Sequence, residues 1–416
     1  MGNITDIFVD HLFRMSRTTL APVALEQARL CLLDYRACVR AGIRLSKEHD
    51  ARFEEIVAKQ GGTVSVEGLP FRTTLHNAAF LNAMHAHVAE LDDGHRRGQI
   101  HLGASILSAL LPVAELEGLA AEDLMRGIVV GYEAAIRLAM AMNPAHKLRG
   151  YHTSGTCGTI GVAMGIAAAL HYEKQQMKAA LSAATASAAG LLEMQEDGSE
   201  LKPYNLAQAA VGGITAAYSA MAGYKGPEDA LGGKRGMLAV MTDQPAMSFL
   251  TEFDGMEYQI EGIYRKPYAA CRHGHAAIEA ALRLKQDYDL KPSGIRHILI
   301  ETYGMAIKGH DHKMIQGIPS AKMSIPFSVA LALFKGAAGV EDYNESTIHD
   351  PDILALAGRV EMTEDPEIAS WIPAKRAARV TISASGGIFR CQDDFPKGEP
   401  ENPMTESEIK AKLIGV

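Results

Sequence analysis

Four long runs rich in alanine, glycine, leucine and methionine constrain the fold of this chain more than any other feature. They lie between residues 75 and 247, at 128–142, 160–171, 177–192 and 207–223. Helices that carry small residues on several sides can approach one another backbone to backbone, so such helices are buried rather than laid over a surface. The runs therefore predict a large helical bundle whose central members are enclosed by the others.

The pattern changes after about residue 260. Runs at 295–302 and 379–383 are typical of short strands, and a glycine turn leads from the second run to 388–391, while 360–362 is a weaker strand candidate. Helices are expected between and around them, at 275–286, 325–334 and 347–357. Near the N-terminus, the pattern from 4 to 42 predicts two helices, the second beginning at Pro22.

The predicted fold class is mainly α, with a large all-helical bundle domain and a smaller α+β lid domain. The bundle is expected to span residues 1–262, with a C-terminal return over 394–416, and the lid 263–393. A chain of 416 residues exceeds what one hydrophobic core normally holds, which favours two domains.

Composition excludes several classes of protein. The net charge is −8 and no basic run occurs, so nucleic acid is not expected as a partner. The five cysteines are far apart and include no CxxC pair, which predicts neither a zinc site nor a disulfide framework and favours a reducing compartment. Without a leader pattern or a run of about 18 apolar residues, a cytoplasmic protein with no membrane partner is expected.

A dense polar insert separates two apolar helical runs at residues 90–101. It holds three carboxylates (Glu90, Asp92 and Asp93), two arginines and two histidines, one of which is His101. Such charges are costly in a core unless they are paired or solvated, so a polar cavity is expected to contain them. An exposed loop between helices is the alternative interpretation.

Four further polar segments precede expected helices, at 150–159, 199–205, 264–275 and 320–327. Lys202 stands beside Pro203 at a helix start, where the helix dipole disfavours a cation, so a fixed anion nearby would explain its position. A surface lysine is the alternative. The segments and the insert together contain residues expected to bind substrate: Glu90, Asp92, Tyr151, Thr153, Ser154, Asn205, Arg272 and His273.

These clusters offer cations, hydrogen-bond donors and acids, but no nucleotide-binding loop and no metal-ligand spacing. Such groups suit the removal of a proton next to a carboxylate in a small di- or tricarboxylic acid. Lysine and histidine would stabilise the developing negative charge while one histidine acts as base. Loss of hydroxide, loss of CO₂ or return of the proton on the other face would each follow from that step.

At these residues the chain resembles the MmgE/PrpD family, which includes 2-methylcitrate dehydratase, cis-aconitate decarboxylase and iminodisuccinate epimerase. The resemblance rests on an ordered set of motifs over nearly the full length: Leu91-Asp92-Asp93 with His101, Tyr151-His152-Thr153-Ser154, Lys202-Pro203, Lys266-Pro267-Tyr268 with His275, and Ala321-Lys322-Met323-Ser324.

The resemblance implies a homodimer, catalysis without metal or organic cofactor, and a small polycarboxylate substrate. The catalytic residues that it implies are His101, His152, Lys202, Lys266, His275 and Asp93. The two histidines at 101 and 152 would handle protons or bind carboxylates, and the two lysines would bind carboxylates and stabilise charge. His275 would help close the pocket from the lid.

The chain departs from the family pattern at positions that bear on substrate. Glu90 stands where family members often have aspartate, Leu102 where they have proline, and Asn205 where they have histidine, while Gln208 replaces an arginine. Fewer cations favour a substrate with fewer carboxylates, or a different set of hydrogen bonds, than in the tricarboxylate enzymes.

Three functions are consistent with these observations. The first is a cofactor-independent lyase of the 2-methylcitrate dehydratase or cis-aconitate decarboxylase type, classed as a hydro-lyase. The second is an epimerase or isomerase of a small dicarboxylate. The third is a non-catalytic helical scaffold that retains the fold, against which stands the presence of charged groups that are costly to bury.

Overall fold

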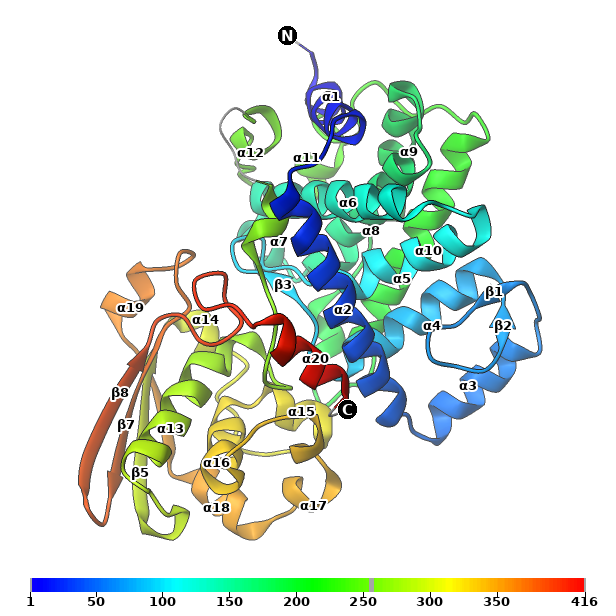
Figure 1. The fold of residues 1–416 in the computed structure, drawn as a ribbon. Helices are drawn as coiled ribbons and strands as arrows, with labels where there is room; N and C mark the ends of the chain where they lie inside the picture. The colour runs from blue at the N-terminus through cyan, green and yellow to red at the C-terminus, as the bar shows by residue number, and fades with distance from the viewer. Residues whose placement is uncertain (1, 254–257, 415–416) are drawn as a thin grey trace. The chain divides into compact units, whose positions relative to one another are not determined.

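The computed structural model of this chain describes residues 2–253 and 258–414 (Figure 1). The chain divides into two compact units. Within the described residues, unit 1 comprises 2–194, 201–263 and 406–414, and unit 2 comprises 195–200 and 264–405. Unit 1 therefore contains both ends of the described part of the chain.

Unit 1 is helical. Its α-helices are α1 (Ile4–Arg17), α2 (Pro22–Arg44), α3 (Glu48–Ala58), α4 (Leu75–Val88), α5 (Gly103–Glu117), α6 (Ala121–Met142), α7 (Ala145–Leu148), α8 (Thr153–Ala169), α9 (Lys174–Ser187), α10 (Lys202–Met221), α11 (Met237–Met241), α12 (Ser248–Thr251) and α20 (Glu406–Ile414). Short strands β1 (Val64–Ser65) and β2 (Arg72–Thr73) form an antiparallel pair, and β3 (Gly94–His95) lies between α4 and α5. The 3-10 helix η2 (Gln259–Gly262) belongs to this unit, while η1 (Leu192–Gln195) and β4 (Ile263–Tyr264) lie at unit boundaries along the chain.

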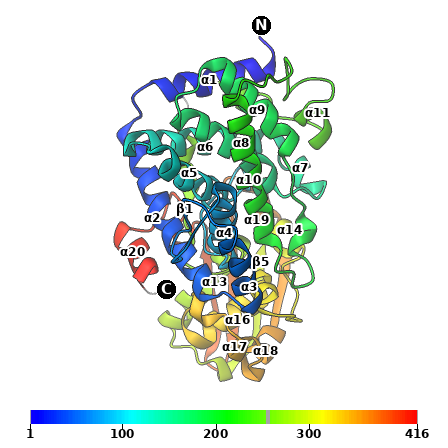
Figure 2. The same ribbon diagram turned by 90° about the vertical axis from the view of Figure 1, so that its right-hand side faces the viewer.

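Close contact between α6 and α8 explains the small residues of the central runs. A Cβ atom added to Gly131 would lie 2.8 Å from the carbonyl oxygen of Gly161, and one added to Gly161 would lie 2.8 Å from that of Gly131. A side chain at either position would therefore push the two backbones apart. Every residue of α8 is buried, which confirms the prediction of central helices enclosed by others (Figure 2).

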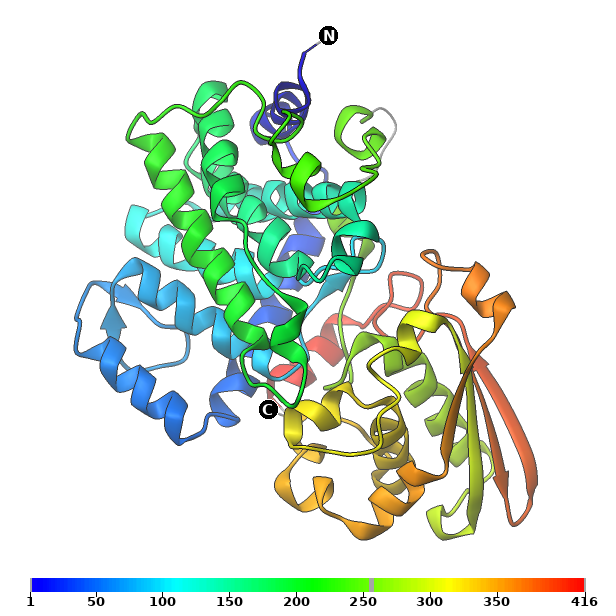
Figure 3. The same cartoon turned by 180° about the vertical axis from the view of Figure 1, so that it is seen from behind.

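Unit 2 contains a four-stranded sheet in the order β6-β5-β7-β8, formed by β5 (Ile295–Thr302), β6 (Val360–Glu364), β7 (Ala378–Ala384) and β8 (Gly387–Asp393) (Figure 3). β5 pairs with β6 in parallel and with β7 antiparallel, and β7 pairs antiparallel with β8. Its helices are η3 (Arg272–Gly274), α13 (His275–Asp287), η4 (Pro292–Gly294), α14 (Gly304–Ile307), α15 (Ile318–Met323), α16 (Ile325–Lys335), η5 (Val340–Asp342), α17 (Glu345–Ile348), α18 (Pro351–Gly358) and α19 (Pro366–Ser370).

The predicted fold class is confirmed, as a mostly helical part and a smaller mixed part. Two expected helices were wrong in extent. The helix expected at 347–357 is two helices, because Asp350 caps a new helix that begins at Pro351. The run 177–192 is helical only as far as Ser187, because Ala188 has an extended backbone, with a ψ of 107°, and Gly190 then adopts a φ of +140°.

The C-terminal tail forms α20, which packs against α2 within unit 1 (Figure 1). Ile409 is completely buried, and Glu406 forms an ion pair with Arg29 of α2. Across the described residues, no helix combines the length and the apolar character that crossing a membrane requires.

Candidate functional site

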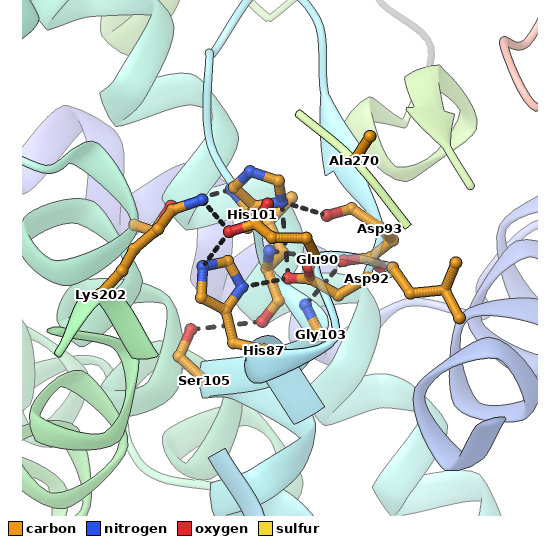
Figure 4. A network of polar contacts seen from close by, with 12 residues as sticks. His87, Glu90, Asp92, Asp93, His101, Gly103, Ser105, Lys202 and Ala270 are labelled. Carbon is orange, nitrogen blue, oxygen red and sulfur yellow. Dashed lines mark hydrogen bonds and ion pairs between the residues drawn. The ribbon is translucent and has the colours of Figure 1, made fainter. Parts of the chain in front are cut away.

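The polar insert between α4 and α5 is buried. Glu90, Asp92 and Asp93 each expose 6% or less of their surface, so the exposed-loop interpretation was wrong. Figure 4 shows these carboxylates close to His87, His101 and Lys202, which come from α4, the insert and α10. Unit 1 thus gathers charged groups from three separate segments into one network.

Asp92 orients two imidazole rings. One of its oxygens lies 2.9 Å from Nδ1 of His87 and 3.4 Å from Nδ1 of His101. Burial alone would raise the pKa of Asp92, but the charges and hydrogen bonds of the two histidines outweigh it and hold that pKa well below its usual range. Asp92 is therefore ionised and holds both rings in fixed orientations.

His101 has a defined tautomer. Its Nδ1 lies 2.9 Å from the carbonyl oxygen of Asp93, which can only accept, so Nδ1 carries the proton and donates it. Nε2 is the nitrogen that remains to accept or deliver a proton. The side chain is 17% exposed, and its backbone N–H donates to Oγ of Ser154. Ser154, expected to bind substrate, here helps to position His101.

Lys202 is the first residue of α10, and its ammonium forms an ion pair with Glu90. The pair is mostly buried, with side chains 12% and 8% exposed. Glu90 is the fixed anion that the sequence predicted, and the surface-lysine alternative was wrong. Glu90 adopts a φ of +54°, an uncommon conformation for a residue with a side chain. The backbone of the insert is thus strained at the residue that meets Lys202.

Asp93 is held at the N-terminus of α5. One carboxylate oxygen accepts from the N–H of Gly103 at 2.8 Å, and the other accepts from the Tyr132 hydroxyl at 2.7 Å. Burial raises the pKa of Asp93 to about 6, although these hydrogen bonds oppose the rise. The carboxylate therefore anchors the insert to α5 and α6.

His152 precedes α8 and lies beside the network, with its ring centroid 6.5 Å from that of His87. Burial, followed by the positive charges of Lys202 and of the two neighbouring histidines, holds the pKa of His152 well below its usual value. Its Nδ1 has no hydrogen-bond partner. The imidazole is therefore neutral, as a general base must be, but burial and the neighbouring cations also make it a weaker base than a free histidine.

The other predicted residues of unit 1 hold the backbone near His152. The amide of Asn205 donates to the carbonyl of Leu191 at 3.0 Å and accepts from its N–H at 3.4 Å. Tyr151 stacks on His146, with ring centroids 4.7 Å apart, and Thr153 accepts a hydrogen bond from Asn143 at 3.3 Å.

Unit 2 brings together a second group of predicted residues. The Arg272 guanidinium pairs with Glu399 at 2.7 Å and donates to Nδ1 of His275 at 2.9 Å, while Nε2 of His275 donates to the carbonyl of Ala270. Both nitrogens of this fully buried histidine are engaged, so it orients Arg272. His273 lies 2.6 Å from the Tyr303 hydroxyl, and Lys266 is completely buried.

Models of two family domains match this sequence: the MmgE/PrpD N-terminal domain over residues 8–250 and the MmgE/PrpD C-terminal domain over 268–415. The chain belongs to the MmgE/PrpD family. Its relatives include a cis-aconitate decarboxylase-like protein, oryM, of Aspergillus oryzae, at 27% identity over 99% of this chain and 90% of the relative. The cis-aconitate decarboxylases of human and mouse are 22% and 20% identical, over 99% of this chain and 87% and 86% of theirs.

One group in this MmgE/PrpD chain is compact enough to hold a metal ion. Among the described residues, ligand atoms of His87, Asp92 and His101 lie within 4.8 Å of one another. However, Nδ1 of each histidine faces an oxygen acceptor at 2.9 Å, so both nitrogens carry protons there. A nitrogen ligand must be deprotonated. A metal ion at this group would have to displace the Nδ1 protons of the two histidines.

Sequence reasoning missed His87 and Tyr132. His87 is three residues before Glu90, on an apolar helix where a histidine resembles an ordinary core residue. The signal in the sequence was the spacing of three residues between His87 and Glu90, which would place both side chains on one face of a helix. Tyr132 lies within the long apolar run of α6, and nothing in its local sequence points to Asp93.

Proposed function

We propose that this MmgE/PrpD protein is a lyase that acts on a small unsaturated or hydroxy polycarboxylate by proton transfer at a carbon next to a carboxylate. The observation that supports it most directly is a neutral imidazole, His152, whose pKa is lowered by burial and by the nearby charges of Lys202 and of His101, the imidazole that Asp92 orients. Decarboxylation of cis-aconitate is the first reaction to test, because relatives aligned over almost the whole chain carry that name.

His152 would act as the base. A carbanion next to a carboxylate delocalises its charge onto the carboxylate oxygens, so a second negative charge develops there. Lys202, which is already fixed by Glu90, would stabilise that charge without reorganising during the reaction. In the proposed step, the proton moves to the imidazole of His152, and the C–H bonding pair stays on the substrate carbon and delocalises into the adjacent carboxylate.

His101 would act as the acid or bind a carboxylate. Because its Nδ1 proton is held by the Asp93 carbonyl, Nε2 is the atom that would deliver a proton. Dehydration requires that proton on the leaving hydroxyl, which departs as water. Decarboxylation releases CO₂ and requires a proton on carbon instead. In decarboxylation the C–C bonding pair stays on the substrate and takes up the proton, so that reaction would need His101 as the acid, whereas dehydration would use both His152 as base and His101 as acid.

An epimerase is the second candidate, since it needs one group to remove a proton and another to return it. His101 and His152 come from separate segments of unit 1 and differ in environment, with a carboxylate partner for the first and an unpartnered Nδ1 in the second. Lys266 and Arg272 of unit 2 remain proposed substrate-binding or charge-stabilising residues. A homodimer without metal or organic cofactor also remains part of the proposal.

The test is incubation of the purified chain in D₂O with a panel of di- and tricarboxylic acids that includes cis-aconitate, followed by proton NMR. We expect consumption of one acid with release of CO₂ or water and deuterium in the remaining acid or product. Exchange with inversion and no alkene would favour the epimerase. Absence of both turnover and exchange across the panel would overturn the enzymatic proposal in favour of the scaffold.

A further inference from the structure

A buried lysine of the C-terminal helix, Lys412, contacts the polar insert. Nζ of Lys412, in α20, lies 2.7 Å from the carbonyl oxygen of Leu91 and 2.6 Å from a carboxylate oxygen of Asp34 in α2. The side chains of Lys412 and Asp34 are 6% and 1% exposed. Helix α20 thus contacts the backbone between the carboxylates of Glu90 and Asp92.

The Leu91 carbonyl is part of the peptide that joins Glu90, the partner of Lys202, to Asp92, which orients the two histidines. Glu90 is held at a φ of +54°, a conformation that costs free energy and persists only where surrounding contacts impose it. A charge-assisted hydrogen bond to the next carbonyl is such a contact.

Lys412 is protonated and carries a positive charge. Burial alone would lower its pKa, but the carboxylate of Asp34 outweighs burial, and the pKa is raised. Ile409, one helical turn earlier on α20, is completely buried and fixes the position of the helix. The ammonium is therefore held rigidly against the Leu91 carbonyl.

We propose that Lys412 is a positioning residue for the site: its ammonium holds the Leu91 carbonyl and so keeps Glu90 and Asp92 in register with Lys202 and the histidines. Lys412 acts through the backbone of the insert and is not itself a catalytic residue. The expected effect of Lys412 on turnover rests on the proposed function. Its expected effect on the backbone of the insert does not depend on that function.

Lys412→Met alone would leave Asp34 buried without a counterion, which is strongly destabilising. The informative variant is therefore Asp34→Asn with Lys412→Met, which removes both charges and takes the ammonium donor away from the Leu91 carbonyl. Lys410→Met is the matched control, because Lys410 lies on the same helix in an exposed ion pair with Glu406.

Three quantities are measured on each full-length variant: the thermal midpoint, amide hydrogen exchange of residues 90–93, and kcat and KM on the substrate found in the panel. For the double variant we expect a midpoint near that of the control, faster exchange at 90–93, and a kcat about 10- to 100-fold lower with a smaller change in KM. Such a result supports a role in positioning beyond the neutralisation of Asp34.

Exchange and kcat equal to those of the Lys410→Met control would overturn the inference, because Lys412 would then serve only as the counterion of Asp34. If wild-type protein turns over no acid while exchange at 90–93 is still faster in the double variant, the clamp on the insert is supported and the proposed function is what fails.

Discussion

Replacing Lys202 with methionine tests the proposed site most directly. Methionine keeps the length of the side chain and removes the charge that faces Glu90. Both partners are nearly buried, at 12% and 8% exposure, so the loss of the ammonium from the Glu90 carboxylate would cost about 3 kcal/mol of folding stability. Loss of one preorganised charge stabiliser would lower kcat roughly 10²- to 10³-fold.

The same substitution should change the pH profile. Burial contributes most to the low pKa of His152, and the charge of Lys202 is the next cause. Without that charge the pKa of His152 rises, and the imidazole becomes protonated at a higher pH. A base that must be neutral then loses activity sooner on acidification, so the acidic limb of kcat/KM moves to higher pH in Lys202→Met.

Lys178→Met is the matched control, since Lys178 is 13% exposed and pairs with Asp6 on another face of unit 1. Both variants are assayed for kcat, KM and thermal midpoint over a range of pH. If Lys202→Met keeps a kcat within about threefold of the control and the same acidic limb, the assignment of Lys202 as a charge stabiliser next to the base is refuted.

Four further outcomes are expected. Burial raises the pKa of Asp93 from 3.8 to about 6, so the folded chain loses stability as the pH rises between those values. The thermal midpoint of Asp93→Asn should therefore rise relative to that of wild type between pH 4 and pH 7. A difference in midpoint that stays constant over this range would contradict the prediction. His152→Gln should reduce turnover at least about 100-fold with the far-ultraviolet circular dichroism unchanged, and an unchanged rate would make His152 structural. EDTA should leave activity intact; loss with rescue by a divalent ion would show a metal requirement. Light scattering should give twice the chain mass of 44.7 kDa. A single species at the mass of one chain would count against a dimer.

Much of the fold follows from local pattern. The strand predicted at 295–302 is β5 with the same bounds, and Pro22 begins α2 as predicted, because β-branched alternation and a proline at a helix start act within a few residues. The helix expected across 347–357 failed for the opposite reason. Its apolar residues continue the helical spacing, and only the Asp350 cap before Pro351 divides it.

The sequence predicted the site where a charged residue occupies an electrostatically unfavourable position. Lys202 at a helix N-terminus called for an anion, and Glu90 is that anion. No such conflict marks Tyr132 or Lys412. A tyrosine in an apolar helix and a lysine in a charged tail look ordinary, and their contacts with Asp93 and Leu91 arise from the packing of segments far apart in sequence.

Charge balance ties the folding of unit 1 to the assembly of its site. Three buried carboxylates of unit 1 each meet a donor from another element: Glu90 meets Lys202 of α10, Asp93 meets Tyr132 of α6, and Asp34 of α2 meets Lys412 of α20. A buried carboxylate without its partner is strongly destabilising. Burying any of these carboxylates before its partner is in place would therefore cost free energy. The geometry that the proposed chemistry needs is therefore also the geometry that lets the polar insert be buried at all, and a protein that retained this fold without the site would have to replace the carboxylates and their partners together.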